Sequence, residues 1–259
     1  MRAAQGALLA YRASRRRAWL LLSGGLVLTL ALGMVFAALG ATGVTPGEIA
    51  ATLAGVLRGE ELSAPQLVIL HLRLPRVVMA AVAGWGLSVS GTAMQGITRN
   101  PLVSPFTIGI SNAAAFGASL SLVFGLGFFP GTRGGVVLTA FALALLCAGT
   151  VYGVAMGAGM SPEALVLTGI GVNYLFSAAT SVIQYFADEH RLAAAVAWAF
   201  GSLNGSGWPQ AGAAFLAVAP CFFGLWLMAP GLNVLSVADD ETARSLGISP
   251  EWIRGIAGI

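Results

Sequence analysis

Charged residues are so sparse in this 259-residue chain that the long uncharged stretches between them predict where its helices lie. A helix needs about 20 apolar residues to cross the hydrocarbon core of a membrane. Trimmed at glycine, proline and polar clusters, the uncharged windows predict about six membrane-spanning helices, at residues 18–40, 77–97, 106–129, 136–157, 164–186 and 209–230. The pattern predicts an all-α polytopic membrane protein, with residues 1–259 forming one transmembrane domain.

The amino-acid composition supports a membrane-embedded chain. Hydrophobic residues make up 57% of the sequence and charged residues 9%, against about 25% charged residues in soluble domains. A surface with so few charges must face lipid rather than water. The 35 glycines agree with this, because small residues let helices approach closely where lipid offers no hydrophobic drive for association.

The positive residues orient the chain. All 13 are arginines spread along the sequence, a distribution that marks loops and orientation and argues against nucleic-acid binding. Four of them, Arg12, Arg15, Arg16 and Arg17, precede a first apolar segment that is too long for a signal peptide. Because positive flanks are retained in the cytoplasm, we expect a retained first helix and a cytoplasmic N-terminus.

Two arginines conflict with a simple count of charges. Arg73 and Arg76 fall on the outer side of the membrane, directly against the second predicted span. Positive residues are disfavoured at that place. Either the orientation is inverted, or these two arginines have a role outside that outweighs their topological cost.

Two connections are predicted to contain structure of their own. The sequence TPGE at residues 45–48 predicts a helix start within the segment 41–72. Residues 231–259 are the most polar stretch, with acidic residues early, Arg244 late and Gly247 at a helix stop. This order predicts a short helix, a turn and a second helix on the cytoplasmic side, with a solvated tail as the alternative.

The sequence contains no catalytic or metal-binding motif. His71 and His190 lie far apart with no cysteine or carboxylate at metal-ligand spacing, and the lysine of a Walker loop is missing. We therefore expect a protein that is not an enzyme and that binds no cofactor or metal. All ten acidic residues lie in loops or at span ends, which argues against a proton-coupled or sodium-coupled carrier.

Several blocks of sequence, in a fixed order, resemble one family. LRLPR at residues 72–76 precedes the second span, and Ser90, Gly91 and Gln95 lie within that span. They are followed by RNPL at 99–102, GIS at 109–111, and then LTGIGVNYLFSAATS, Trp198, GSLNGSGW, LNVLSV and ETARSLG. The blocks resemble the iron-siderophore, haem and vitamin B12 permease family of ABC importers.

The resemblance implies partners on both sides of a cytoplasmic (inner) membrane. Arg73 and Arg76 match positions that meet glutamates of a soluble, external substrate-binding protein, and arginine forks suit such carboxylates. Anchoring of the span end in lipid headgroups is the alternative role. The polar stretch matches coupling helices that fit into a cytoplasmic ATP-binding subunit, with candidate contacts Asp240, Glu241, Ala243, Arg244, Leu246 and Gly247. Asp239 departs from this pattern, because the family usually has a glycine there.

Two further sets of residues are expected to serve transport. Asn100 and Leu102 match a cytoplasmic gate, a role that is compatible with a plain Asn-Pro turn between spans. Residues 161–163 occupy the place of a second gate segment, but their types differ from the vitamin B12 member and the role is not carried over. The fifth span is polar enough to line a pathway, or to join helices by hydrogen bonds, through Thr168, Asn173, Ser177 and Thr180.

The resemblance implies a permease subunit that pairs with a second copy or a paralogue, sits in lipid and leaves ATP hydrolysis to its partner. A ferric siderophore is the expected substrate, with haem or vitamin B12 as alternatives. A carrier or channel that needs no ATPase is the alternative outside the family. Family members carry about ten spans of about 20 residues each, so we expect an incomplete domain that ends at the start of a further span.

Overall fold

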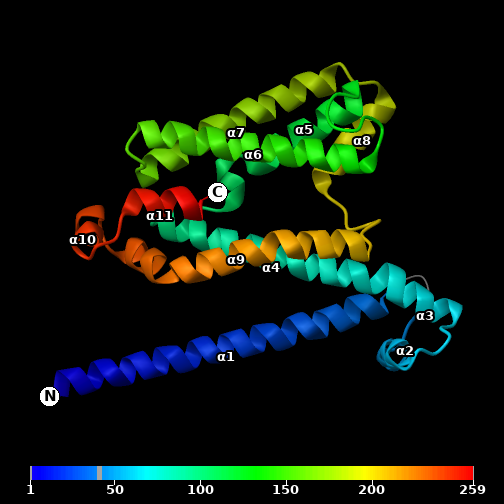
Figure 1. Cartoon of the computed structure of the whole chain (residues 1–259), viewed down its shortest axis with the longest axis horizontal. Coiled ribbons are helices and arrows are strands. Elements are labelled where there is room, and N and C mark those ends of the chain that lie inside the picture. Colours follow the sequence, from blue (N-terminus) through cyan, green and yellow to red (C-terminus); the bar gives the residue numbers. More distant parts are fainter. Residues whose placement is uncertain (1, 40–42, 259) are drawn as a thin grey trace. The chain divides into compact units, whose positions relative to one another are not determined.

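The computed structural model describes residues 2–39 and 43–258, which form helices joined by turns (Figure 1). No β-strand occurs in these residues, and the all-α prediction is confirmed. Five helical segments of this part are long and apolar enough to cross a membrane. They lie in α1 (Arg2–Ala38), the rod that ends with α4 (Leu74–Thr98), α6 (Arg133–Gly157), α7 (Pro162–Tyr185) and α9 (Trp208–Val237).

The second predicted span lies inside a longer rod. Helix α3 (Ala64–Val68), the π-helical turn η1 (Ile69–Arg73) and α4 follow one another without a break over 35 residues. The predicted window, 77–97, covers only the second part of this rod, because Arg73 and Arg76 interrupt the apolar pattern without interrupting the helix.

The third predicted span, 106–129, differs most from the structure. It opens with the 3-10 turn η2 (Pro105–Ile108), bends at Gly109 with a φ of 89°, and continues as α5 (Ile110–Phe124). Helix α5 has 15 residues, about 22 Å of helix against a hydrocarbon core of about 30 Å. A short helix and irregular backbone are tolerated at membrane depth where protein buries them. The buried residues of α5 are Ala113, Gly117, Ala118, Ser119, Ser121 and Val123.

The chain divides into two compact units. Unit 1 comprises Met1–Ala83 and Leu203–Phe215. In this unit α2 (Pro46–Arg58) begins where the sequence predicts, with a capping box between Thr45 and Glu48. A small core connects α2 to the end of α1 and to η1 through Ala37, Val44, Ile49 and Ile69.

Unit 2 comprises Gly84–Ser202 and Leu216–Ile259. In this unit α5 packs against α6, α7 and α8 (Glu189–Phe200) (Figure 1). At Gly117 of α5, an added methyl group would lie 2.9 Å from the carbonyl oxygen of Thr139 on α6. Only glycine therefore allows α5 and α6 to approach this closely.

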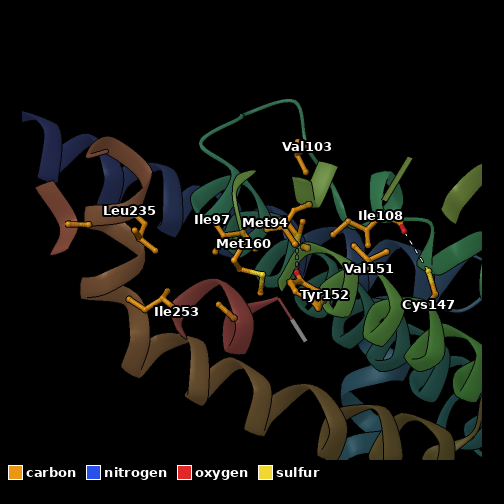
Figure 2. Close-up of a cluster of buried hydrophobic side chains, with 14 of the residues drawn as sticks. Met94, Ile97, Val103, Ile108, Cys147, Val151, Tyr152, Met160, Leu235 and Ile253 are labelled. Carbon is orange, nitrogen blue, oxygen red and sulfur yellow. Dashed lines mark hydrogen bonds between the residues drawn. The ribbon is translucent and has the colours of Figure 1, made fainter. Parts of the chain in front are cut away.

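The main buried cluster of unit 2 includes the two short helices near the C-terminus (Figure 2). Ala243 comes from α10 (Asp240–Ser245) and Ile253 from α11 (Pro250–Ala257). They join Met94 and Ile97 of α4 and Leu235 of α9. The polar C-terminal stretch is thus a folded part of unit 2, and the alternative of a solvated tail is wrong.

Candidate coupling and gate site

Helices α10 and α11 are shaped by the residues at their ends. The Asp239 carboxylate caps α10 by accepting a hydrogen bond from the backbone N–H of Thr242 at 2.9 Å. Gly247 ends α10 with a φ of 79°, in a region where glycine has no Cβ penalty. Pro250 stands in the first turn of α11, where its missing N–H is not needed. The predicted order of helix, turn and helix is therefore present.

The α10–α11 segment has one buried and one exposed face. Ala243 is 0% exposed, whereas Leu246 is 62% exposed and Trp252 is 60% exposed. Arg244 is exposed as well and forms an ion pair with Glu251 between the two helices. Of the predicted contacts for an ATP-binding subunit, the exposed ones are Glu241, Arg244, Leu246 and Gly247.

The Asp240 carboxylate lies in an ion cluster within unit 2. Arg254, whose side chain is 0% exposed, donates to both of its oxygens at 2.7 Å from two guanidinium nitrogens. The Arg99 guanidinium pairs with the same carboxylate. Arg254 also donates to the carbonyl oxygens of Ile97 at 3.1 Å and Met160 at 3.2 Å. We call Arg99, Asp240 and Arg254 the ion cluster.

Electrostatics explains why two arginines can share one carboxylate. The carbonyls of Ile97 and Leu235, which accept from Arg254 and Arg99, belong to the last turns of α4 and α9. The helix dipole is negative at such ends and offsets the surplus positive charge. Hydrogen bonds from Arg254, together with both positive charges, lower the pKa of Asp240 from 3.8 to about 2.

Sequence reasoning missed Arg99 and Arg254 as site residues, although one signal was available. Pro250, Ile253, Arg254 and Ala257 follow the i, i+3, i+4, i+7 spacing and are the buried residues of α11. A lone arginine on the apolar stripe of an amphipathic helix predicts a buried acidic partner, because an unpaired charge is not tolerated there.

The predicted gate residues form a tight turn directly after α4. Arg99 ends the helix with a φ of 51°, and the Asn100 side-chain oxygen accepts from the N–H of Leu102 at 2.9 Å. Gln95 closes the turn by donating to the carbonyl of Pro101 at 2.8 Å. Leu102 itself is 88% exposed. Asn100 thus shapes the turn, and Leu102 projects from it.

The two predicted docking arginines lie in unit 1 and are both partly buried. Arg73 donates to the carbonyl oxygens of Ala37 and Ala38, each at 2.9 Å, and so caps the C-terminal end of α1. Within the described part of the chain, the buried Nε of Arg76 has no hydrogen-bond partner. Arg73 therefore has a structural role in addition to any docking role.

The predicted pathway residues lie along α7 in partly buried positions. Asn173 accepts a hydrogen bond from Asn112 of α5 at 2.8 Å, and Thr180 donates to the carbonyl of Phe176 on its own helix at 2.8 Å. Asn173 therefore joins two helices, which was the alternative to a pathway role. Thr168 and Ser177 are half-buried on the same helix.

A cavity of about 590 Å³ lies in unit 2 between α4 and α9, beside the turn at residues 99–103 that holds the predicted gate residues. Ser88, Thr92 and Gln95 line it from one face of α4, and Arg99 lines it directly after the end of that helix. Among the described residues, no group of three or more His, Cys, Asp or Glu side chains lies together in a way that could hold a metal ion.

Residues 26–259 match the profile of the FecCD transport family. A protein of Methanocaldococcus jannaschii described as an ABC transporter permease is 36% identical over 238 residues, 88% of this chain and 67% of the relative. The achromobactin transport system permease protein of Dickeya dadantii is 37% identical over 238 residues, 88% of this chain and 64% of the relative. The chain thus spans about two thirds of the length of these two curated relatives.

Other relatives, each 36% identical, are named as the permeases of a hemin transport system in Yersinia pestis, a cobalamin import system in Halobacterium salinarum and a molybdate import system in Haemophilus influenzae. A solved structure described as a metal-chelate type ABC transporter in an inward-facing conformation is 29% identical. It matches with a TM-score of 0.73 over 90% of this chain and 71% of that chain.

Proposed function

The chain belongs to the FecCD transport family, and on this premise we propose that it is the permease subunit of an ATP-binding-cassette importer. The observation that carries the proposal is the folded α10–α11 segment, which exposes Leu246 and Trp252 while Ala243 and Arg254 anchor it. Exposed apolar side chains on a rigid element outside the spans suit a protein partner. A cytoplasmic ATP-binding subunit is the partner that we propose for this face.

We propose an iron chelate, and specifically a ferric siderophore, as the substrate. The name of the Dickeya dadantii relative and the metal-chelate description of the solved transporter support this class. Hemin and cobalamin, which appear in the names of other relatives, are the competing substrates. The permease would do no covalent chemistry, and its partner would bind and hydrolyse ATP.

A soluble substrate-binding protein is the proposed partner on the outer face. Arg76 is the better candidate for meeting its carboxylates, because Arg73 already donates to the end of α1. An arginine with unused donor capacity gains most from a bidentate carboxylate.

We further propose a pair of permease subunits, two copies or this chain with a paralogue, in the cytoplasmic (inner) membrane. Only 6% of an 18-residue apolar window within the segment Ser14–Ala38 of α1 is buried within the chain, which favours contact of this helix with lipid or a second subunit. The exposed Arg15, Arg16 and Arg17 at the start of this apolar segment favour a cytoplasmic N-terminus.

Co-purification with the ATP-binding subunit tests the proposal. We compare Leu246→Glu with Leu57→Glu, whose leucine is 89% exposed on α2 in the other unit. A buried charge at the interface should abolish capture of the ATP-binding subunit and ATP-dependent uptake for Leu246→Glu only. Capture that survives this variant would refute the coupling assignment.

An uptake assay in cells that produce the parent chain and the ATP-binding subunit identifies the substrate. Uptake of a labelled ferric siderophore is measured against labelled hemin and cobalamin. Preference for either competitor would reject the siderophore. Uptake that continues without any ATP-binding subunit would reject the importer and favour a carrier or channel.

A further inference from the structure

The ion cluster connects two segments that the proposed function requires to act together. Asp240 is the first residue of α10. Arg99 is the first residue of the gate turn, residues 99–103, and directly precedes Asn100. The Arg99 guanidinium pairs with Asp240 and donates from Nε to the carbonyl of Leu235 at 2.9 Å. Arg99 is therefore bonded to the α10–α11 segment by its side chain and to the gate turn by its backbone.

We propose that Arg99, Asp240 and Arg254 form a rigid link that makes the α10–α11 segment and the turn at residues 99–103 move as one body. This inference rests on the proposed function, because only in a permease does such a link couple an ATPase to a gate. Arg99 and Arg254 are positioning residues in this role. Asp240 is an internal anchor and not a contact for the ATP-binding subunit.

The bonding of the carboxylate supports an anchor rather than a contact. Both oxygens of Asp240 accept from Arg254, and one of them also accepts from Arg99. Although 28% of the Asp240 side chain is exposed, a partner protein that bound its carboxylate would have to compete with or displace the guanidinium groups of Arg254 and Arg99. Glu241, the next residue, is exposed and needs no such displacement.

The geometry of the cluster also explains its rigidity. A planar arginine fork on a carboxylate fixes both distance and orientation, unlike a single flexible hydrogen bond. Arg254 adds two further bonds, to the carbonyls of Ile97 at the end of α4 and Met160 in the loop before α7. Helix α11 is thus held at several points and cannot turn about any one of them.

A distance measurement within the chain tests the link without any partner. Cysteines are placed at Leu102 and Leu246, which are 88% and 62% exposed, in a Cys221→Ser background in which only the buried Cys147 remains. Both sites receive nitroxide labels in nanodiscs, and pulsed electron paramagnetic resonance gives their distance distribution. The matched control is Asp188→Asn, because Asp188 forms an exposed ion pair with Arg191 in the same unit.

We expect a narrow distribution for the labelled parent and for Asp188→Asn, and loss of the narrow peak for Asp240→Asn. Arg99→Gln, which leaves the fork of Arg254 on Asp240 intact, should lose it as well. Equal widths in all variants would overturn the link. Retained protection of Cys147 from thiol reagents shows that a broadened variant is still folded, because Cys147 is 0% exposed.

A transport readout separates this inference from the proposed function. Asp240→Asn should still capture the ATP-binding subunit through Leu246 while the amount of substrate moved per ATP hydrolysed falls. Loss of capture would instead make Asp240 a direct contact and overturn the anchor role. If Leu246→Glu leaves capture intact but Asp240→Asn still broadens the distances, the link stands and the proposed function fails.

Discussion

Replacing Gly109 by alanine should weaken the junction between α5 and α7. Gly109 closes η2 and opens α5 with a φ of 89°, a backbone conformation that side chains rarely adopt. An added methyl group would also lie 2.8 Å from Cα and 2.9 Å from the backbone nitrogen of Asn173 on α7. Because the obstacle is backbone, it cannot move aside as a flexible side chain would.

Two terms make up the expected loss of stability at Gly109. A non-glycine residue in the left-handed region costs about 1–2 kcal/mol, and overpacking a close helix contact costs about 1–3 kcal/mol. Together they predict about 2–5 kcal/mol for Gly109→Ala. Gly171 is the control, since it lies on α7 with no atom near an added methyl group. Alanine there should be neutral or stabilising by about 0.5–1 kcal/mol.

Thiol reactivity on heating measures this junction directly. The Cys147 thiol is buried and donates to the carbonyl of Ile108, next to Gly109, at 3.5 Å (Figure 2). In a Cys221→Ser background, a maleimide dye therefore reports the opening of this part of unit 2. Gly109→Ala should react at a temperature roughly 5–15 °C lower than its parent. Identical curves for Gly109→Ala and Gly171→Ala would refute the steric argument.

Two further predictions concern charge. Because the folded-state pKa of Asp240 is lowered from 3.8 to about 2, its carboxylate contributes stability that is complete above pH 3.8 and is lost as the pH falls toward 2. The melting temperature of the parent should therefore fall faster over this window than that of Asp240→Asn, and parallel curves would contradict the role of the ion cluster. Arg76→Gln should weaken binding of the substrate-binding protein severalfold at low salt and less at 1 M salt, where the Debye length is about 3 Å. Arg58→Gln, at an exposed position of α2, is the control, and equal affinities for the two variants would refute docking through Arg76.

Features that depend on local chemistry were predictable from the sequence. The capping box of Thr45 and Glu48 is formed as the TPGE pattern indicates, with the Thr45 N–H donating to the Glu48 carboxylate at 2.7 Å. Gly247 ends α10 in the left-handed region, as a glycine after a helix predicts. Such signals work because cap and helix are neighbours in the chain.

The turn that shortens α5 could not be predicted in the same way. Gly109 and Gly125 both have positive φ and limit α5 to 15 residues. An uncharged window with many glycines gives no indication of which of them turns the backbone. That choice depends on Asn173 of α7, which leaves no room for a side chain at Gly109.

The pairing of residues within the ion cluster could not be predicted from the sequence, because its members are distant in the chain. Arg99 and Asp240 are 141 residues apart, and their pairing requires the ends of α4 and α9 to meet first. Arg73 illustrates the same limit, since its bonds to Ala37 and Ala38 span 36 and 35 residues. Charge placement along the chain singled out Arg73 and Arg76 but neither Arg99 nor Arg254, and only the fold shows which groups these arginines bond to.

The ion cluster is better suited to fixing register than to adding stability. Removing two charges from water is expensive, and apolar replacements of buried ion pairs are often as stable as the pair itself. Ile97, Leu235 and Ile253 already supply apolar packing in the main buried cluster of unit 2, which also includes Ala243 of α10 (Figure 2). Apolar contacts can slide past one another, whereas the fork of Arg254 on Asp240 accepts one geometry only. We infer that packing holds the α10–α11 segment in unit 2 and that the ion cluster sets its position, which predicts that Asp240→Asn loses the narrow distance distribution while Cys147 stays protected.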